Sequence, residues 1–139
     1  MTVTLIDQAT LTMAAIDPVG AQLISLKDPS GKEYIWQRDP AFWSDCSPIL
    51  FPSVGNCRDG RTLFDGVWYD MKKHGFCREA EFEVAQRTDS SAVFRLTSNN
   101  HTRRSYPYDF SLSLAYRLTG GILSMDYIVE NRGSSAMHY

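Results

Sequence analysis

A histidine on a glycine-containing loop is the residue of this chain best suited to acid–base chemistry. His74 lies in the segment Lys72–Arg78, directly before a glycine and between two segments with the pattern of strands. A histidine there can present a ring nitrogen to a ligand, and its pKa near neutrality suits proton transfer or hydrogen bonding. Phe76 can supply an apolar face to a ligand ring, and Arg78 a charged donor. Each also has a structural interpretation, as a surface histidine, a core phenylalanine and part of a solvated strand edge.

The three cysteines match no common disulfide or metal-binding pattern. Cys46, Cys57 and Cys77 are spaced 11 and 20 residues apart, unlike a disulfide framework or a paired CxxC zinc site. We therefore expect reduced thiols in a packed interior, no metal and a cytoplasmic protein. A nucleophilic Cys77 is an alternative, because His74 lies three residues before it.

Charge and hydropathy exclude two classes of protein. The 14 basic and 16 acidic residues leave a net charge of -2, and no run of like charge exceeds a pair. A nucleic-acid-binding module would show a clustered basic face, so we expect no nucleic acid partner. The longest uncharged stretch, Cys46–Cys57, contains two prolines and is shorter than the roughly 20 apolar residues of a membrane span. The N-terminus has neither a basic leader nor a long apolar run, so we expect no signal peptide and no membrane association.

Apolar residues alternate with polar ones along most of the chain. The alternation is clearest over Tyr108–Leu118, and it resumes over Leu123–Val129 after a turn at Thr119–Gly121, which predicts an antiparallel hairpin. No segment has a sustained helical period, so the pattern predicts an all-β protein built as an antiparallel sandwich or barrel. The same pattern predicts earlier strands over Thr2–Ile6, Leu11–Ile16, Ala21–Lys27, Glu33–Trp36, Val67–Met71, Glu79–Gln86 and Ala92–Thr97.

One region, Trp43–Arg78, breaks the alternation. It contains the segment Cys46–Asn56, whose two prolines exclude a central strand although the segment is apolar. An irregular apolar segment inside a β protein is a plausible pocket wall. A hairpin over Arg61–Met71 follows and leads to the His74 loop.

The order of several short motifs resembles the aldose 1-epimerase (galactose mutarotase-like) family. The likeness runs from about Gly20 to Tyr139 and is greatest to the bacterial branch with a His-Gly-Phe-Ala-Arg motif, in which Cys77 replaces the alanine here. The motifs are Gly20–Leu26, Tyr34–Trp36, Leu50–Gly55, Asp59–Gly60, His74–Arg78, Tyr106–Phe110 and Val129–Asn131.

The resemblance implies a large β-sandwich, the galactose mutarotase-like supersandwich, with a sugar cleft across one sheet. Family members interconvert the α and β anomers of an aldohexose such as galactose or glucose by acid–base ring opening and closure, without a cofactor. His74 matches the first histidine of the family, Phe76 would stack on the sugar, and Arg78 would bind it. Where the family has an arginine this chain has Asn56, and Arg58 two positions on is the candidate substitute.

The resemblance also implies that part of the site is missing. Family members are longer, and their second histidine and carboxylate base lie in the second half. His138 does not match that second histidine. We therefore expect residues 1–139 to form a single partial domain, the N-terminal half of the sandwich, that holds a sugar but is inactive alone.

Other functions remain open for such a chain. A non-catalytic carbohydrate-binding domain would keep the fold without the acid–base pair, and a structural β-sandwich interaction module would use His74 and Phe76 only for packing. A phosphorylated hexose is a further option for the ligand. Open sheet edges would invite self-association.

Overall fold

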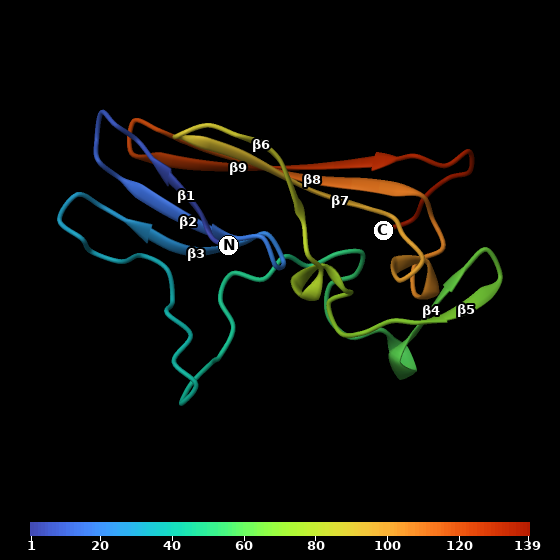
Figure 1. Cartoon of the computed structure of the whole chain (residues 1–139). Helices are drawn as coiled ribbons and strands as arrows, with labels where there is room; N and C mark the ends of the chain where they lie inside the picture. The colour runs from blue at the N-terminus through green and yellow to red at the C-terminus, as the bar shows by residue number, and fades with distance from the viewer.

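Three antiparallel sheets make up the chain. A computed structural model describes residues 1–139, and all of its strand pairs are antiparallel (Figure 1). This confirms the prediction of an all-β, antiparallel protein. The first sheet contains β1 (Val3–Ile6), β2 (Met13–Asp17) and β3 (Gln22–Lys27). The second is the hairpin of β4 (Arg61–Phe64) and β5 (Val67–Asp70). The third contains β6 (Glu83–Arg87), β7 (Ser91–Thr97), β8 (Phe110–Thr119) and β9 (Ile122–Asn131).

Helical structure is limited to three short turns. The 3₁₀ helices η1 (Arg58–Gly60), η2 (Cys77–Glu79) and η3 (Thr102–Arg104) each span three residues. None of them has the length or apolar character needed to cross a bilayer.

Two predicted strands differ from the structure. Glu33–Trp36 makes a single bridge to Lys27 and no strand, because the Glu33 carboxylate accepts the backbone N–H groups of Leu26, Tyr34 and Ile35. A side chain that binds these donors takes the place of a strand ladder.

The strand predicted over Glu79–Gln86 begins later than expected. Residues 77–79 form η2, and β6 starts only at Glu83. The backbone between them is bonded to the loop after β2, since Gly20 N–H donates to the Ala80 carbonyl and Phe82 N–H to the Pro18 carbonyl. Competition from this distant loop has no signature in the local sequence.

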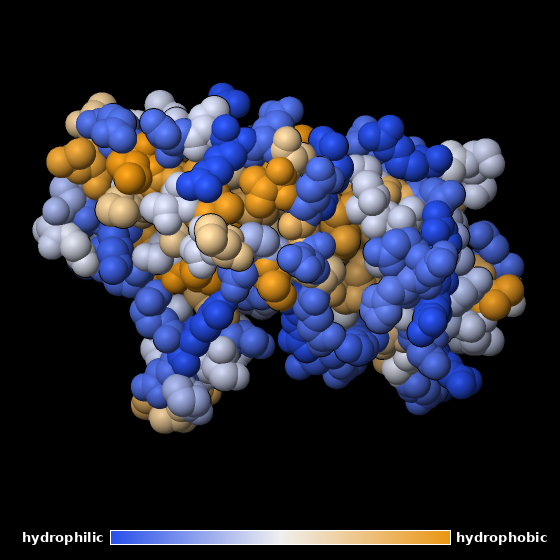
Figure 2. All heavy atoms as spheres, viewed as in Figure 1, coloured by the Kyte–Doolittle hydropathy of each residue, from blue (hydrophilic) through white to orange (hydrophobic).

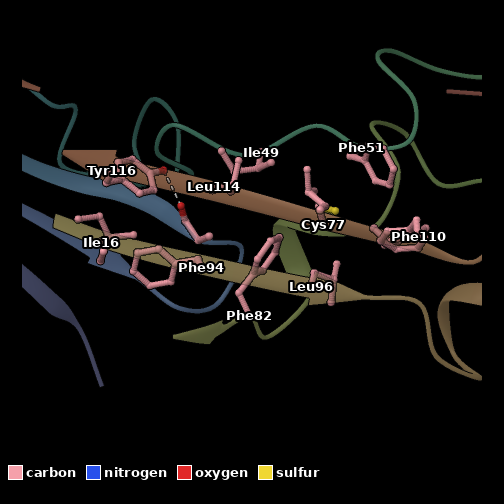
Figure 3. Packing of buried hydrophobic residues seen from close by; sticks show 14 of the residues in the cluster. Ile16, Ile49, Phe51, Cys77, Phe82, Phe94, Leu96, Phe110, Leu114 and Tyr116 are labelled. Carbon is pink, nitrogen blue, oxygen red and sulfur yellow. Dashed lines mark hydrogen bonds between the residues drawn. The ribbon is translucent and has the colours of Figure 1, made fainter. Parts of the chain in front are cut away.

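The core lies between the inner face of the four-stranded sheet and the first sheet with its adjoining irregular segment. Alternate residues of β8 form the inner face, and all five are at most 1% exposed: Phe110, Leu112, Leu114, Tyr116 and Leu118. Side chains of β1 and β2 pack in the same cluster, which explains the alternation in those strands. Figure 3 shows the Phe94 and Tyr116 rings with Ile16 and Ile49 in this interior. The Tyr116 hydroxyl donates to the Ala21 carbonyl at 2.7 Å and so joins the two layers.

A polar contact joins the first sheet to the last hairpin. The Asp7 carboxylate accepts the Thr10 hydroxyl at 2.7 Å and the Gly121 N–H at 2.8 Å. These hydrogen bonds hold the pKa of Asp7 below its ordinary value, with Thr10 making the larger contribution. At this end of the molecule apolar residues also reach the surface, as the upper left of Figure 2 shows.

Candidate functional site

The irregular segment predicted as a pocket wall packs directly against the His74 loop. Phe76 N–H donates to the Phe51 carbonyl at 3.1 Å, and Phe51 and Gly75 form a parallel bridge. The approach is so close that a Cβ on Gly75 would lie 2.0 Å from the Phe51 oxygen. Gly75 also has a φ of +74°, which glycine adopts readily. Glycine at this position is therefore required for the two segments to meet.

His74 is held by two hydrogen bonds to one residue. Its N–H donates to the Gly55 carbonyl at 2.9 Å, and its Nδ1 accepts the Gly55 N–H at 2.9 Å. Because Nδ1 acts as the acceptor, this contact assigns the proton of the neutral ring to Nε2. The ring is half-buried, and its only side-chain hydrogen bond is the one to Gly55. His74 is thus oriented with Nε2–H available to donate to a ligand oxygen.

Asn56 and Arg58 lie just after Gly55 in the sequence, and both are exposed. Asn56 directly follows Gly55 and is exposed. Arg58 begins η1, with a side chain that is 96% exposed and 3.8 Å from the Asp59 carboxylate. An exposed pair of neighbours contributes little to stability, so this guanidinium is free to bind a ligand. It lines a cavity of about 330 Å³ with Asp59, Arg61 and Trp68 rather than packing on His74.

Phe76 and Arg78 differ in how far they reach solvent. Phe76 is 8% exposed, and its ring packs against Phe51, Tyr106 and Phe110 at centroid distances of 6.1 to 6.5 Å. The structure therefore places it in the core, the packing role that the sequence left open beside stacking on a sugar. The Arg78 side chain is half-buried and lies 3.8 Å from the Asp45 carboxylate. It keeps a partly accessible guanidinium beside the loop.

Burial removes Cys77 from the candidate nucleophiles. The residue is fully buried, and desolvation raises the pKa of its thiol far above the ordinary range. The thiolate is the nucleophilic form, so a thiol held protonated in the core is unreactive. Figure 3 shows its sulfur within the apolar cluster. The alternative of a nucleophilic Cys77 activated by His74 is therefore wrong. The chain also contains no cluster of three or more His, Cys, Asp or Glu residues arranged to hold a metal ion.

Two further cavities flank the His74 loop, and sequence reasoning missed most of their lining. The larger, about 500 Å³, is lined by apolar and polar residues, among which Lys72 and Glu79 form an ion pair at 2.5 Å. The Lys72 ammonium holds the pKa of Glu79 below its ordinary value. The lining of this cavity also includes Phe76, Leu96, Asn99 and His101.

The second cavity, about 430 Å³, lies beside the apolar segment that precedes Gly55. Pro52, Ser53, Val54 and the C-terminal residues His138 and Tyr139 contribute to its lining. The Ser53 hydroxyl is buried without a hydrogen-bond partner, although a buried polar group normally has one. The local sequence, a serine between a proline and a valine, does not predict that this hydroxyl is buried without a partner.

Comparison with known proteins places this geometry in a family. A family model described as aldose 1-epimerase matches residues 1–139. The LacX proteins of Lactococcus lactis subsp. lactis, plasmid and chromosomal, are each 35% identical to the chain over an alignment of 121 residues, and the match covers 81% of this chain and 40% of the LacX protein.

Solved structures agree with the sequence comparison. A galactose mutarotase related enzyme from Lactobacillus acidophilus has a TM-score of 0.93 and 33% identity over 99% of this chain and 45% of its own. A galactose mutarotase-like protein from Lactobacillus casei has a TM-score of 0.93 and 35% identity over 99% of this chain and 46% of its own. The chain thus spans less than half the length of these relatives. The match over residues 1–139, together with the shared fold, shows that the chain belongs to the aldose 1-epimerase family.

Proposed function

We propose that this chain forms the sugar-holding part of an aldose 1-epimerase that interconverts the α and β anomers of an aldohexose such as galactose or glucose. The observation that carries the proposal is the hydrogen bond from Gly55 N–H to His74 Nδ1. It leaves Nε2–H as a donor whose direction is set by the backbone. A donor aimed at the sugar is what ring opening needs, because charge develops on oxygen as the ring C–O bond breaks.

The reaction consists of two proton transfers that a neutral site can support. A general base removes the proton of the anomeric hydroxyl while a general acid protonates the ring oxygen. The open-chain aldehyde then rotates about its C1–C2 bond, and closure on the other face returns both protons. In this scheme His74 holds the sugar through Nε2–H, while Asn56, Arg58 and Arg78 bind its hydroxyls.

The general base and the general acid are proposed to lie outside the matched half. His74 is hydrogen-bonded only to backbone groups of Gly55, so no carboxylate of these residues activates it. The relatives contain more than twice the matched length, which is room for both groups. We therefore expect residues 1–139, a partial domain, to bind a sugar without catalysing its epimerisation. A cytoplasmic location stays a prediction.

Replacing His74 tests this proposal. Isothermal titration calorimetry with galactose and glucose should show weaker binding by His74→Ala, by about tenfold for one lost hydrogen bond. Stability should fall by only about 1 kcal/mol, the contribution of the bond to Gly55. Lys73→Ala, at the exposed neighbouring position, is the control and should bind as the wild type does. Unchanged affinity with a large drop in melting temperature would instead support a packing role.

A non-catalytic carbohydrate-binding domain is the second candidate, since residues 1–139 hold the binding groups without a carboxylate at His74. Polarimetry separates the two. The purified native protein, with its intact mass recorded, either accelerates the change in rotation of α-D-glucose or leaves the spontaneous rate unchanged. Acceleration by a protein heavier than 15.7 kDa supports the epimerase, and sugar binding without acceleration supports the binding domain.

A further inference from the structure

The turn between β2 and β3 is bonded to the segment that carries Arg78. Gly20 N–H donates to the Ala80 carbonyl at 2.7 Å, and Phe82 N–H donates to the Pro18 carbonyl at 2.9 Å. Both bonds join backbone to backbone, so they form whatever the side chains are. They hold the turn against the residues that directly follow η2.

Gln22, the first residue of β3, adds a side-chain contact to these backbone bonds. Its Nε2–H group donates to the Arg78 carbonyl at 3.2 Å, between residues 56 apart in sequence. A longer contact, 3.5 Å to the Val19 carbonyl, keeps the amide over the turn. No backbone N–H donates to the Arg78 carbonyl, so Gln22 is its only partner in the chain. Because the peptide group is planar, a bond at this carbonyl orients the backbone directly after Arg78.

Gly20 provides the space for this contact. Its φ is +73°, a left-handed conformation that glycine adopts readily. A Cβ at this position would lie 2.6 Å from the Gln22 Nε2 and 2.7 Å from the Arg78 oxygen. The two atoms of the hydrogen bond therefore meet beside the glycine, and a side chain there would push them apart.

The Arg78 guanidinium has free donors. Its side chain is 30% exposed, and the Asp45 carboxylate lies 3.8 Å away, which is too far for a hydrogen bond. A guanidinium presents its N–H donors in a fixed plane, so its use in binding depends on where the backbone holds it. Cys77, directly before Arg78, is fully buried and fixes the start of η2 (Figure 3). The bond from Gln22 fixes the other side of Arg78.

We infer that Gln22 is a positioning residue for Arg78, whose guanidinium it directs toward the sugar hydroxyls. The inference rests on the proposed function, in which Arg78 binds the sugar. The backbone bonds of Gly20 and Phe82 already fasten the turn, so the side-chain bond contributes direction more than stability. Gln22 does not touch the sugar in this scheme and acts only through Arg78.

A double-mutant cycle in the native protein tests this role. Gln22→Met keeps the length of the side chain and removes the donor, and it should weaken galactose and glucose binding by about twofold to tenfold in calorimetry. Adding it to Arg78→Ala should weaken binding no further, because its effect passes through the missing guanidinium. Gln86→Met makes the same exchange at an exposed position of β6 and should bind as the wild type does.

Kinetics and a second variant separate positioning from folding. If the native protein accelerates mutarotation, Gln22→Met should raise KM by the factor seen in calorimetry and leave kcat unchanged, because Arg78 binds the sugar and moves no proton. Gln22→Glu has the same shape without an N–H, and it should weaken binding at least as much. The melting temperatures of both variants should stay close to that of the wild type.

The outcomes also separate this inference from the proposed function. Wild-type affinity in Gln22→Met, a loss that multiplies with that of Arg78→Ala, or a large drop in melting temperature would overturn the positioning role and leave the function standing. If Arg78→Ala and His74→Ala both bind the sugars as the wild type does, or if the wild type binds neither sugar, the proposed function fails and the role of Gln22 fails with it.

Discussion

The four-stranded sheet and the longer segment Cys46–Arg78, which runs from the pocket wall through the β4–β5 hairpin to the His74 loop, are held in place by different kinds of contact. In the sheet, β8 pairs with β7 and β9 along most of its length, and the inner side chains form a continuous apolar layer. In the segment, a few contacts between residues far apart in sequence set the backbone, such as Phe76 N–H to the Phe51 carbonyl and His74 to Gly55.

The two regions therefore depend on different features of the chain. Many similar side-chain contacts stabilise the sheet, so the stability of the sheet depends on side-chain volume. A few backbone contacts fix the segment, so the geometry of the segment depends on single atoms. Candidate ligand-binding residues lie in the segment, which is consistent with the placement of function on loops fixed by a rigid scaffold.

Adding one methyl group to the segment should have the largest effect. Gly75→Ala would put a Cβ 2.0 Å from the Phe51 oxygen, which is backbone and cannot move aside cheaply. We expect a loss of more than about 4 kcal/mol of unfolding free energy, measured by urea denaturation. Gly66→Ala is the control, because its φ is +81° and a Cβ there would meet no other atom within 4 Å. It should lose only the about 1–2 kcal/mol of a left-handed residue. Equal losses in both variants would assign the effect to φ rather than to the contact.

Removing a whole ring from the sheet should cost somewhat less. Phe94 is fully buried, and its ring lies 5.8 Å from that of Tyr116. Phe94→Ala should lose about 3–5 kcal/mol in the same urea experiment, through lost transfer energy and the cavity left behind. A loss no larger than that of Gly66→Ala would show that the sheet is loosely packed and would remove the contrast with the segment.

Alkaline pH should weaken the segment through Cys77. Burial raises the pKa of this thiol in the folded state above its ordinary value of 9.0. Above about pH 9 the folded chain keeps the thiol proton, whereas the unfolded chain loses it. The unfolding free energy is therefore unaffected below about pH 9 and falls as the pH rises above that value. At pH 10 the cost is about 1.4 kcal/mol. The effect of Cys77 is measured by comparing the melting temperatures of the wild type and Cys77→Ala between pH 8 and pH 10. The melting temperature of the variant should fall less steeply with pH.

The smallest effect expected is that of one hydroxyl between the layers. Tyr116→Phe removes the buried bond to the Ala21 carbonyl and should cost about 1 kcal/mol. Tyr108→Phe removes a longer, partly exposed bond of 3.2 Å to Asp65 and should cost less. If both variants unfold at the same urea concentration as the wild type, these hydroxyls do not contribute to the junction between layers.

The same division explains what the sequence could predict. Alternation predicted β8 and β9 to within two residues at each end, because a half-buried strand imposes its period on the sequence. Alternation wrongly predicted a strand over Glu33–Trp36, where the Glu33 carboxylate binds the backbone N–H groups. It also placed the start of a strand too early, at Glu79, where the backbone that follows is bonded to a distant loop. Motif resemblance predicted His74 as a site residue, but the bond that orients its ring joins residues 19 apart in sequence. The burial of Phe76 likewise depends on Phe51, and no local pattern encodes either contact.

The Asp7 contact has a consequence for the order of events during synthesis. The carboxylate and the Gly121 N–H that it accepts are 114 residues apart in sequence. A ribosome makes Asp7 first, so this bond must wait until the turn between β8 and β9 has been made. Contacts of such long range close late and slow folding, because the chain between them must be ordered first. The strands that are translated first would thus be among the last to be fixed in the fold. In nascent chains halted before Gly121, the first sheet should still be cleaved by proteases.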